Sequence, residues 1–125
     1  MSAIQLRAIG LILCAAVVFG TGGWLTSAGR PYGVALQTVH KLVALAAVII
    51  IAVTVYEPMR IGAVSTGESI VIWVAGLLVI ASFASGAVVS ASDSAPFWVL
   101  RLHRVVPWFA GVLAAVGVYI TAGRV

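Results

Sequence analysis

The sequence predicts an all-α membrane protein: four transmembrane helices in an up-and-down bundle, made of two tandem helical hairpins related by a pseudo-twofold axis. Three observations predict this class. Of the 125 residues, 63% are apolar and only 8% are charged, which is outside the composition of soluble domains. Four charge-free runs follow one another, and one segment recurs along the chain. Strands with alternating polarity are absent, so helices must satisfy the backbone polar groups.

The charge-free runs cover residues 8–29, 42–56, 69–92 and 105–123. A helix needs roughly 20 mostly apolar residues to cross the hydrocarbon core. The second run is too short alone, but a helix that begins near Gly33 and includes His40 and Lys41 in its first turns spans fully, with the lysine amine reaching the interface. The predicted loops are short and comprise residues 29–33, 57–67 and 90–96. Residues 1–125 are therefore expected to form a single four-helix domain.

The internal repeat superimposes residues 9–56 on 72–119 when the chain is moved by 63 positions, without a gap. The repeat units are taken as about 8–56 and 71–119. Matches of Ala or Val carry little weight in so apolar a chain. Scarce residue types carry the repeat: Gly23 on Gly86, Ser27-Ala28 on Ser90-Ala91, His40-Lys41 on His103-Arg104, and Tyr56 on Tyr119. Its length is that of a helical hairpin, which is why two hairpins are expected.

Several other interpretations are disfavoured. The first apolar run is long for a signal peptide, and its removal would leave its repeat partner unpaired. The net charge of +4 comes from few residues, and no Lys/Arg cluster indicates binding of nucleic acid. Cys14 is the only cysteine, so it forms no disulfide within the chain. Basic residues are nearly balanced between the two predicted sides, so they do not set an orientation.

His40 and His103, the only histidines, are the candidate functional residues. In an up-and-down bundle the second and fourth helices run in the same direction and lie diagonally across the core. Equivalent residues on them are expected to face each other at one depth. Ionisable groups inside membranes are costly and indicate function. No carboxylate is expected nearby, so the sequence gives neither histidine an obvious structural partner.

The residues around the histidines are small, which predicts a slot between the helices. The second helix continues inward from His40 through Ala44 and Ala47, and the fourth continues from His103 through Pro107 and Ala110. Gly23 and Gly86 are expected near the depth of the histidines, where glycine permits close approach. Small residues of this kind also tighten helix contacts in any membrane bundle. Pro107 removes the amide that would bond the His103 carbonyl, and should bend the helix there.

A haem suits this donor set better than a zinc ion does. Zinc usually takes three or four protein ligands, whereas haem needs only axial ligands. Without a CxxCH motif the expected group is one non-covalent haem b, with His40 and His103 as iron ligands. Four cations on the histidine side are candidate partners of its propionates: Arg30, Lys41, Arg101 and Arg104. Lys41 and Arg104 are the strongest because they follow the histidines in both repeats. The tyrosines Tyr56 and Tyr119 fit an aromatic belt.

With its pieces Val39-His40-Lys41 and Leu102-His103-Arg104, the chain resembles membrane b-type cytochromes with four-helix haem bundles, and especially one half of a haem A synthase. In such halves the second and fourth helices each carry a haem-facing histidine, commonly followed by a basic residue. The chain departs from the synthase pattern at Gln37, where the synthase has an acidic residue, and it lacks the synthase's cysteine pair. The resemblance therefore implies haem binding rather than synthase activity.

Two axial histidines favour one-electron transfer over oxygen binding. We therefore expect an electron-transfer cytochrome in the lipid bilayer of a prokaryotic plasma membrane, with quinone or a redox protein as its partner. Two alternatives stay open. One is a haem-dependent quinol or superoxide oxidoreductase. The other is a non-haem assembly or transport subunit, in which the histidines bond to each other or to backbone.

Overall fold

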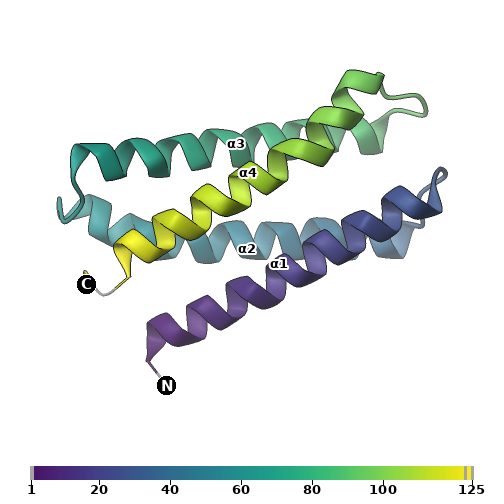
Figure 1. Cartoon of the computed structure of the whole chain (residues 1–125). Helices are drawn as coiled ribbons and strands as arrows, with labels where there is room; N and C mark the ends of the chain where they lie inside the picture. The colour runs from purple at the N-terminus through teal and green to yellow at the C-terminus, as the bar shows by residue number, and fades with distance from the viewer. Residues whose placement is uncertain (1, 123, 125) are drawn as a thin grey trace. The chain divides into compact units, whose positions relative to one another are not determined.

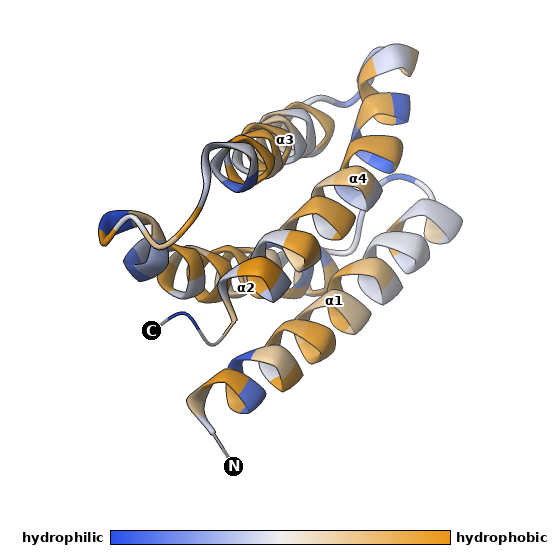
Figure 2. Cartoon of the chain, turned by 60° about the vertical axis from the view of Figure 1, so that its left-hand side comes forward, coloured by the Kyte–Doolittle hydropathy of each residue, from blue (hydrophilic) through white to orange (hydrophobic). Residues whose placement is uncertain are grey.

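The computed structural model describes residues 2–122 and 124, and this part of the chain contains four α-helices. They are α1 (Ala3–Ala28), α2 (Val34–Arg60), α3 (Thr66–Ala91) and α4 (Phe97–Thr121). Each is long enough and apolar enough to cross a membrane. Figure 2 shows apolar residues along most of each helix and hydrophilic residues mainly near the ends and turns. The predicted all-α fold with four membrane-spanning helices is confirmed.

The helices begin where the sequence offers capping groups. Ser2 and Gln5 form a capping box at the start of α1, in which the Ser2 amide donates to the Gln5 side chain at 2.8 Å. Ser65 and Glu68 form the same box at the start of α3, with a distance of 2.7 Å. Such boxes satisfy amides that have no partner within the helix. The two boxes occupy equivalent positions of the repeat, so the repeat extends to the first residues of each hairpin.

The end of α2 differs from the sequence prediction. A loop was expected from residue 57, but α2 continues through Pro58 to Arg60. Gly62, with φ of 69°, then ends it: the Ala63 amide bonds the Pro58 carbonyl at 2.9 Å, and the Gly62 amide bonds that of Met59 at 3.2 Å. This is the pattern of a Schellman motif, in which glycine adopts the left-handed conformation at low cost.

The chain divides into two compact units, Met1–Thr54 and Val55–Val125. In the first unit, α1 lies antiparallel to the greater part of α2 (Figure 1). The Cβ position of Gly10 lies 3.6 Å from the Ile50 side chain, which shows how closely the two helices pack. Thr54 is buried, and its hydroxyl donates to the Ile50 carbonyl at 2.7 Å. Small residues let membrane helices approach in this way.

The second unit contains the hairpin of α3 and α4 (Figure 1) and also the last residues of α2. Its buried apolar side chains come from both helices of the hairpin: Ala75 and Val89 from α3, and Val99, Ala110 and Ala114 from α4. Gly117 packs against Ile72, whose Cγ1 lies 3.4 Å from the glycine's Cβ position. The helix α4 continues through Pro107, and the bend expected there stays a prediction.

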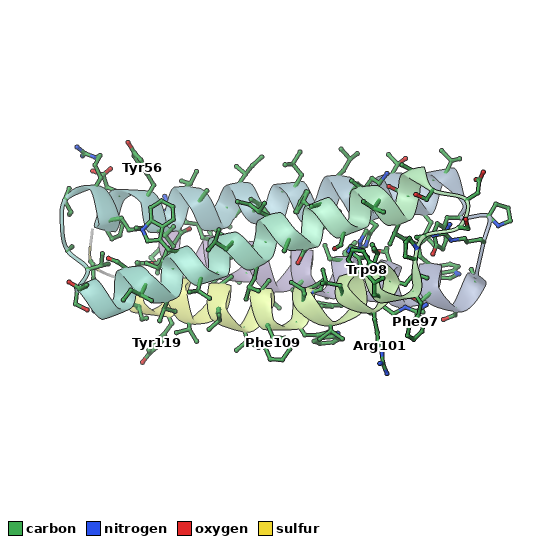
Figure 3. The ribbon with its side chains drawn as sticks, turned by 90° about the horizontal axis from the view of Figure 1, so that it is seen from above. Tyr56, Phe97, Trp98, Arg101, Phe109 and Tyr119 are labelled. Atoms are coloured by element: carbon green, nitrogen blue, oxygen red, sulfur yellow. The ribbon has the colours of Figure 1, made fainter. Side chains whose placement is uncertain are left out.

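Aromatic side chains mark the two ends of the second unit (Figure 3). Phe97, Trp98 and Arg101 lie together at the start of α4, and Tyr119 lies toward its other end. Tyr56 lies at the same end as Tyr119. Both tyrosines are exposed, Tyr119 to 82%. Aromatic rings at both ends of a hydrophobic span are typical of the two membrane interfaces.

Candidate functional site

His40, in the second turn of α2, is hydrogen-bonded to α1 through its Nδ1 atom. Nδ1 lies 3.1 Å from the carbonyl oxygen of Val18 and 3.0 Å from the hydroxyl oxygen of Thr21. A carbonyl oxygen can only accept, so the proton is on Nδ1. The Thr21 hydroxyl donates its own proton to the Val17 carbonyl at 2.6 Å. Its oxygen therefore accepts from the imidazole, and the Nδ1–H group is shared between two acceptors on α1.

His103, in the second turn of α4, makes the same set of bonds with α3. Its Nδ1 atom lies 3.1 Å from the Ser82 carbonyl oxygen and 3.1 Å from the Ser85 hydroxyl oxygen. The Ser85 hydroxyl donates to the Ser82 carbonyl at 3.0 Å, so its oxygen is again an acceptor. Ser85 is buried. The two hairpins thus hold their histidines by one arrangement, a main-chain carbonyl and a side-chain hydroxyl three residues apart.

These hydrogen bonds assign the tautomer of both rings. A neutral imidazole with its proton on Nδ1 carries its lone pair on Nε2. Histidines that bind metals are oriented in the same way, with one ring nitrogen donating to a carbonyl or carboxylate while the other coordinates. The expectation that neither histidine has a structural partner is wrong, because carbonyl and hydroxyl groups within each hairpin supply one. The sequence could not show this, since main-chain acceptors leave no residue-specific signal.

Glycines make room for the two rings. A Cβ atom added to Gly22 would lie 3.2 Å from Cε1 of His40, and one added to Gly86 would lie 2.7 Å from Cε1 of His103. Gly86 was expected at this depth and is there. Gly23 was also expected there, but a Cβ atom at Gly23 has no neighbour within 4 Å, so the contact with His40 belongs to Gly22. The role of Gly23 as a lining of a cofactor site stays a prediction.

The shift from Gly23 to Gly22 reflects a difference of one residue in helix pairing between the two hairpins. The less exposed faces of α2 and α4 follow the repeat as aligned by sequence, whereas those of α1 and α3 do not. On α1 and α3 this face recurs at steps of three and four residues, as in left-handed coiled packing. It includes Leu11, Cys14, Val18, Thr21 and Leu25 on α1, and Ala75, Leu78, Ser82, Ser85 and Val89 on α3.

Sequence reasoning missed the two hydroxyl residues because the ungapped repeat aligns Thr21 with Ala84. Moving the alignment by one further residue matches Phe19-Gly20-Thr21-Gly22 with Phe83-Ala84-Ser85-Gly86. This pattern, a phenylalanine, a small residue, a hydroxyl residue and a glycine, is the signal that could have identified both. The hydroxyl contacts Nδ1 in each hairpin, and the glycine beside it faces the ring.

The small residues predicted inward of the histidines lie on the packed faces of their helices. Ala110 is buried, at 5% exposure, and Ala44, Ala47 and Pro107 are partly buried. These faces continue directly from His40 and His103 along α2 and α4. Their part in lining a cofactor stays a prediction.

The four predicted cations differ in their surroundings. Arg30 places its guanidinium 5.3 Å from the centre of the Tyr32 ring, and Arg101 lies 5.4 Å from that of Phe97. Both distances suit a cation–π contact, and Figure 3 shows Arg101 and Phe97 near the start of α4. Lys41 and Arg104, which follow the histidines, are exposed.

Chemically, each hairpin holds one imidazole whose Nδ1–H group is the hydrogen-bond donor, so that its lone pair is on Nε2. Among the described residues, no group of three or more His, Cys, Asp or Glu side chains could together hold a metal ion. A haem requires only axial ligands from protein, and an oriented imidazole is one such ligand. Comparison with protein families, curated proteins and solved structures gave no match to this chain.

Proposed function

We propose that the chain is a membrane cytochrome b that binds one haem b through His40 and His103 and transfers single electrons. The observation that carries the proposal is the matched hydrogen bonding of the two rings. Nδ1 of each histidine donates to a carbonyl and a hydroxyl within its own hairpin, which makes Nε2 the nitrogen that carries the lone pair and would coordinate iron. The same pair of bonds is present in both hairpins.

The chemistry that the haem supplies is reversible one-electron transfer. Two histidine ligands fill both axial positions of iron, which disfavours oxygen binding. The protein's part is to fix the two rings through α1 and α3, to surround them with apolar small residues, and to offer cations to the propionates. Lys41 and Arg104 are the proposed propionate partners, since charge-assisted bonds to carboxylates are strong. A quinone or a redox protein at the histidine side is the proposed electron partner.

The first experiment is a reduced-minus-oxidised absorption spectrum of the detergent-purified protein after expression with ample haem, with haem and protein quantified. The proposal expects a low-spin b-type spectrum at about one haem per chain, as one pair of axial ligands allows. A well-folded protein without haem under these conditions would contradict it. Helical content measured by circular dichroism separates that outcome from misfolding.

The same hydrogen bonds favour one second candidate, a non-haem membrane subunit in which the histidines only join the helices of each hairpin. A carbonyl bond satisfies one nitrogen of a partly buried imidazole and stabilises the helix pair. The two candidates make opposite predictions for Nε2. The cytochrome requires a ligand nitrogen at both rings, whereas the non-haem subunit tolerates replacement of either histidine by another residue that donates to the carbonyl.

A further inference from the structure

The hydroxyl groups of Thr21 and Ser85 each contact a side chain of a neighbouring helix as well as a carbonyl of their own helix. Several other hydroxyls bond a carbonyl one turn back in their own helix: Ser27, Thr38, Thr54 and Ser90. Thr21 and Ser85 also make such a bond, but their oxygens lie 3.0 and 3.1 Å from a histidine Nδ1 on the neighbouring helix. Each hydroxyl lies next to the glycine that the ring contacts.

The local bond of each hydroxyl determines what it offers to the ring. Thr21 has one hydroxyl proton and donates it to the Val17 carbonyl at 2.6 Å. Ser85 donates its proton to the Ser82 carbonyl at 3.0 Å. A hydroxyl that has given its proton away can only accept from the imidazole, through its remaining lone pairs. Both side chains are therefore set as acceptors before any ligand binds.

A hydrogen-bond acceptor for the Nδ1–H group changes how strongly Nε2 binds a metal. A hydrogen bond from the remote N–H of a ligating imidazole fixes the tautomer, orients the ring and raises the basicity of the ligand nitrogen. In a low-dielectric surrounding such a bond is stronger than in water. Two acceptors, a carbonyl and a hydroxyl, polarise the Nδ1–H group more strongly than a single acceptor does. A more basic ligand stabilises the oxidised iron over the reduced iron, so it lowers the reduction potential.

We propose that Thr21 and Ser85 are positioning residues, which hold the two imidazoles in the Nδ1–H tautomer and strengthen Nε2 as a ligand. The effect on a bound haem rests on the proposed function, whereas the effect on the tautomer does not. The two hydroxyls act independently, each on the histidine of its own hairpin. The residue type can vary between threonine and serine because only the hydroxyl is used.

The test removes each hydroxyl with little change of shape, by Thr21→Val and Ser85→Ala. Matched controls are Thr38→Val on α2 and Ser90→Ala on α3, whose hydroxyls bond carbonyls of their own helix. The conservative variant Thr21→Ser should restore the parent behaviour. All variants are made in the full chain, and circular dichroism confirms that each one folds.

The first readout is the ring-nitrogen NMR spectrum of histidine-labelled protein without haem. The proposal expects both histidines of the parent protein to carry the proton on Nδ1. Thr21→Val should weaken the Nδ1–H hydrogen bond of His40 alone, and Ser85→Ala that of His103 alone, seen as an upfield shift of the bonded proton. A proton on Nε2 of either histidine in the parent, or equal shifts in the controls, would overturn the proposal.

The second readout is made on the haem-loaded protein. Both hydroxyl variants should raise the midpoint potential and weaken haem binding by about 10- to 100-fold, which is the usual loss for such outer partners. The controls and Thr21→Ser should match the parent in both. A potential unchanged from the controls would overturn the claim on ligand strength. Failure of the parent protein to bind haem would instead contradict the proposed function, while the NMR result still decides the role of the hydroxyls.

Discussion

Gly86 and His103 are in closer contact than any side chain at that glycine would permit. A Cβ atom there would lie 2.7 Å from Cε1 and 3.3 Å from both ring nitrogens of the histidine. The corresponding pair in the first hairpin, Gly22 and His40, leaves 3.2 Å. The Cε1 corner of the His103 ring therefore faces Gly86, and the absence of a side chain at Gly86 is a condition for the position of the ring.

Substituting Gly86 by alanine should destabilise the protein and displace the His103 ring. Overpacking of a tight contact typically costs about 1–3 kcal/mol, against a gain of about 0.5–1 kcal/mol from replacing glycine in a helix. Gly22→Ala should cost less, and Gly23→Ala, with open space at its Cβ position, should be neutral or stabilising. Thermal unfolding in detergent measures the order. A Gly86→Ala protein as stable as Gly23→Ala would contradict the contact.

Replacing either histidine by alanine should abolish stoichiometric haem binding, because one axial ligand is then missing from the proposed pair. His40→Ala and His103→Ala should each lose the low-spin spectrum, measured as haem per chain after purification. The control is Gln37→Ala, which lies one turn before His40 and was not predicted to bind haem. Full haem retention in either histidine variant would exclude the bis-histidine assignment.

Neutralising the two cations next to the histidines should weaken haem retention without abolishing it. In Lys41→Gln and Arg104→Gln the proposed charge-assisted bonds to propionates are lost, while the axial ligands remain. The double variant should lose haem faster than either single one when a haem-binding competitor is added. Arg60→Gln is the matched control, because Arg60 is paired with Glu57 at the far end of α2. Equal rates of haem loss in the double variant and this control would show that neither cation binds the propionates.

Breaking the ion pair between Glu68 and Arg124 should lower the stability of the second unit. Arg124 donates to the carboxylate from both terminal nitrogens of its guanidinium group, at 2.9 and 2.7 Å, and Nη1 also donates to the Ala63 carbonyl at 2.7 Å. Glu68→Gln and Arg124→Gln should each lower the unfolding temperature, and the effect should shrink as salt rises because the pair is partly exposed. The double variant should be no worse than the single ones. Additive losses would show that the residues act separately.

Alanine at Gly62 should destabilise the turn between α2 and α3. Gly62 has φ of 69°, a conformation that costs other residues about 1–2 kcal/mol. Gly67→Ala in the first turn of α3 is the control, because its Cβ position is open and a helical residue gains from the change. Unfolding temperatures of the two variants should move in opposite directions. A loss of equal size in both would rule out strain at Gly62 as the cause.

The four helices could be predicted because charge and hydropathy report directly on the membrane. The end of α2 could not, since Glu57 looked like a loop residue. It lies one turn before the helix end instead, where it pairs with Arg60. A single charged residue cannot tell the last turn of a helix from the loop after it.

At the candidate site, the histidines and Gly86 could be predicted from the repeat, and the haem itself stays a proposal. Gly22, Thr21 and Ser85 could not, because the ungapped alignment fixes one register for both helices of a hairpin. The way two helices pair depends on side-chain size and hydrogen bonding, which a constant offset in the sequence does not capture. Relative to their histidines, Thr21 and Ser85 differ by one position. The role of the Val18 and Ser82 carbonyls as hydrogen-bond acceptors could not be predicted either, because every residue type has a main-chain carbonyl.

Because each histidine is bonded to the helix immediately before it in the chain, each half of the site is complete in itself. Synthesis proceeds from the N-terminus, so the bonds of His40 can form once α2 emerges, before α3 has been translated. His103 repeats the process later with Ser82 and Ser85. A prosthetic group would then be met by two rings already oriented, and its insertion would need no rearrangement of either imidazole within its hairpin.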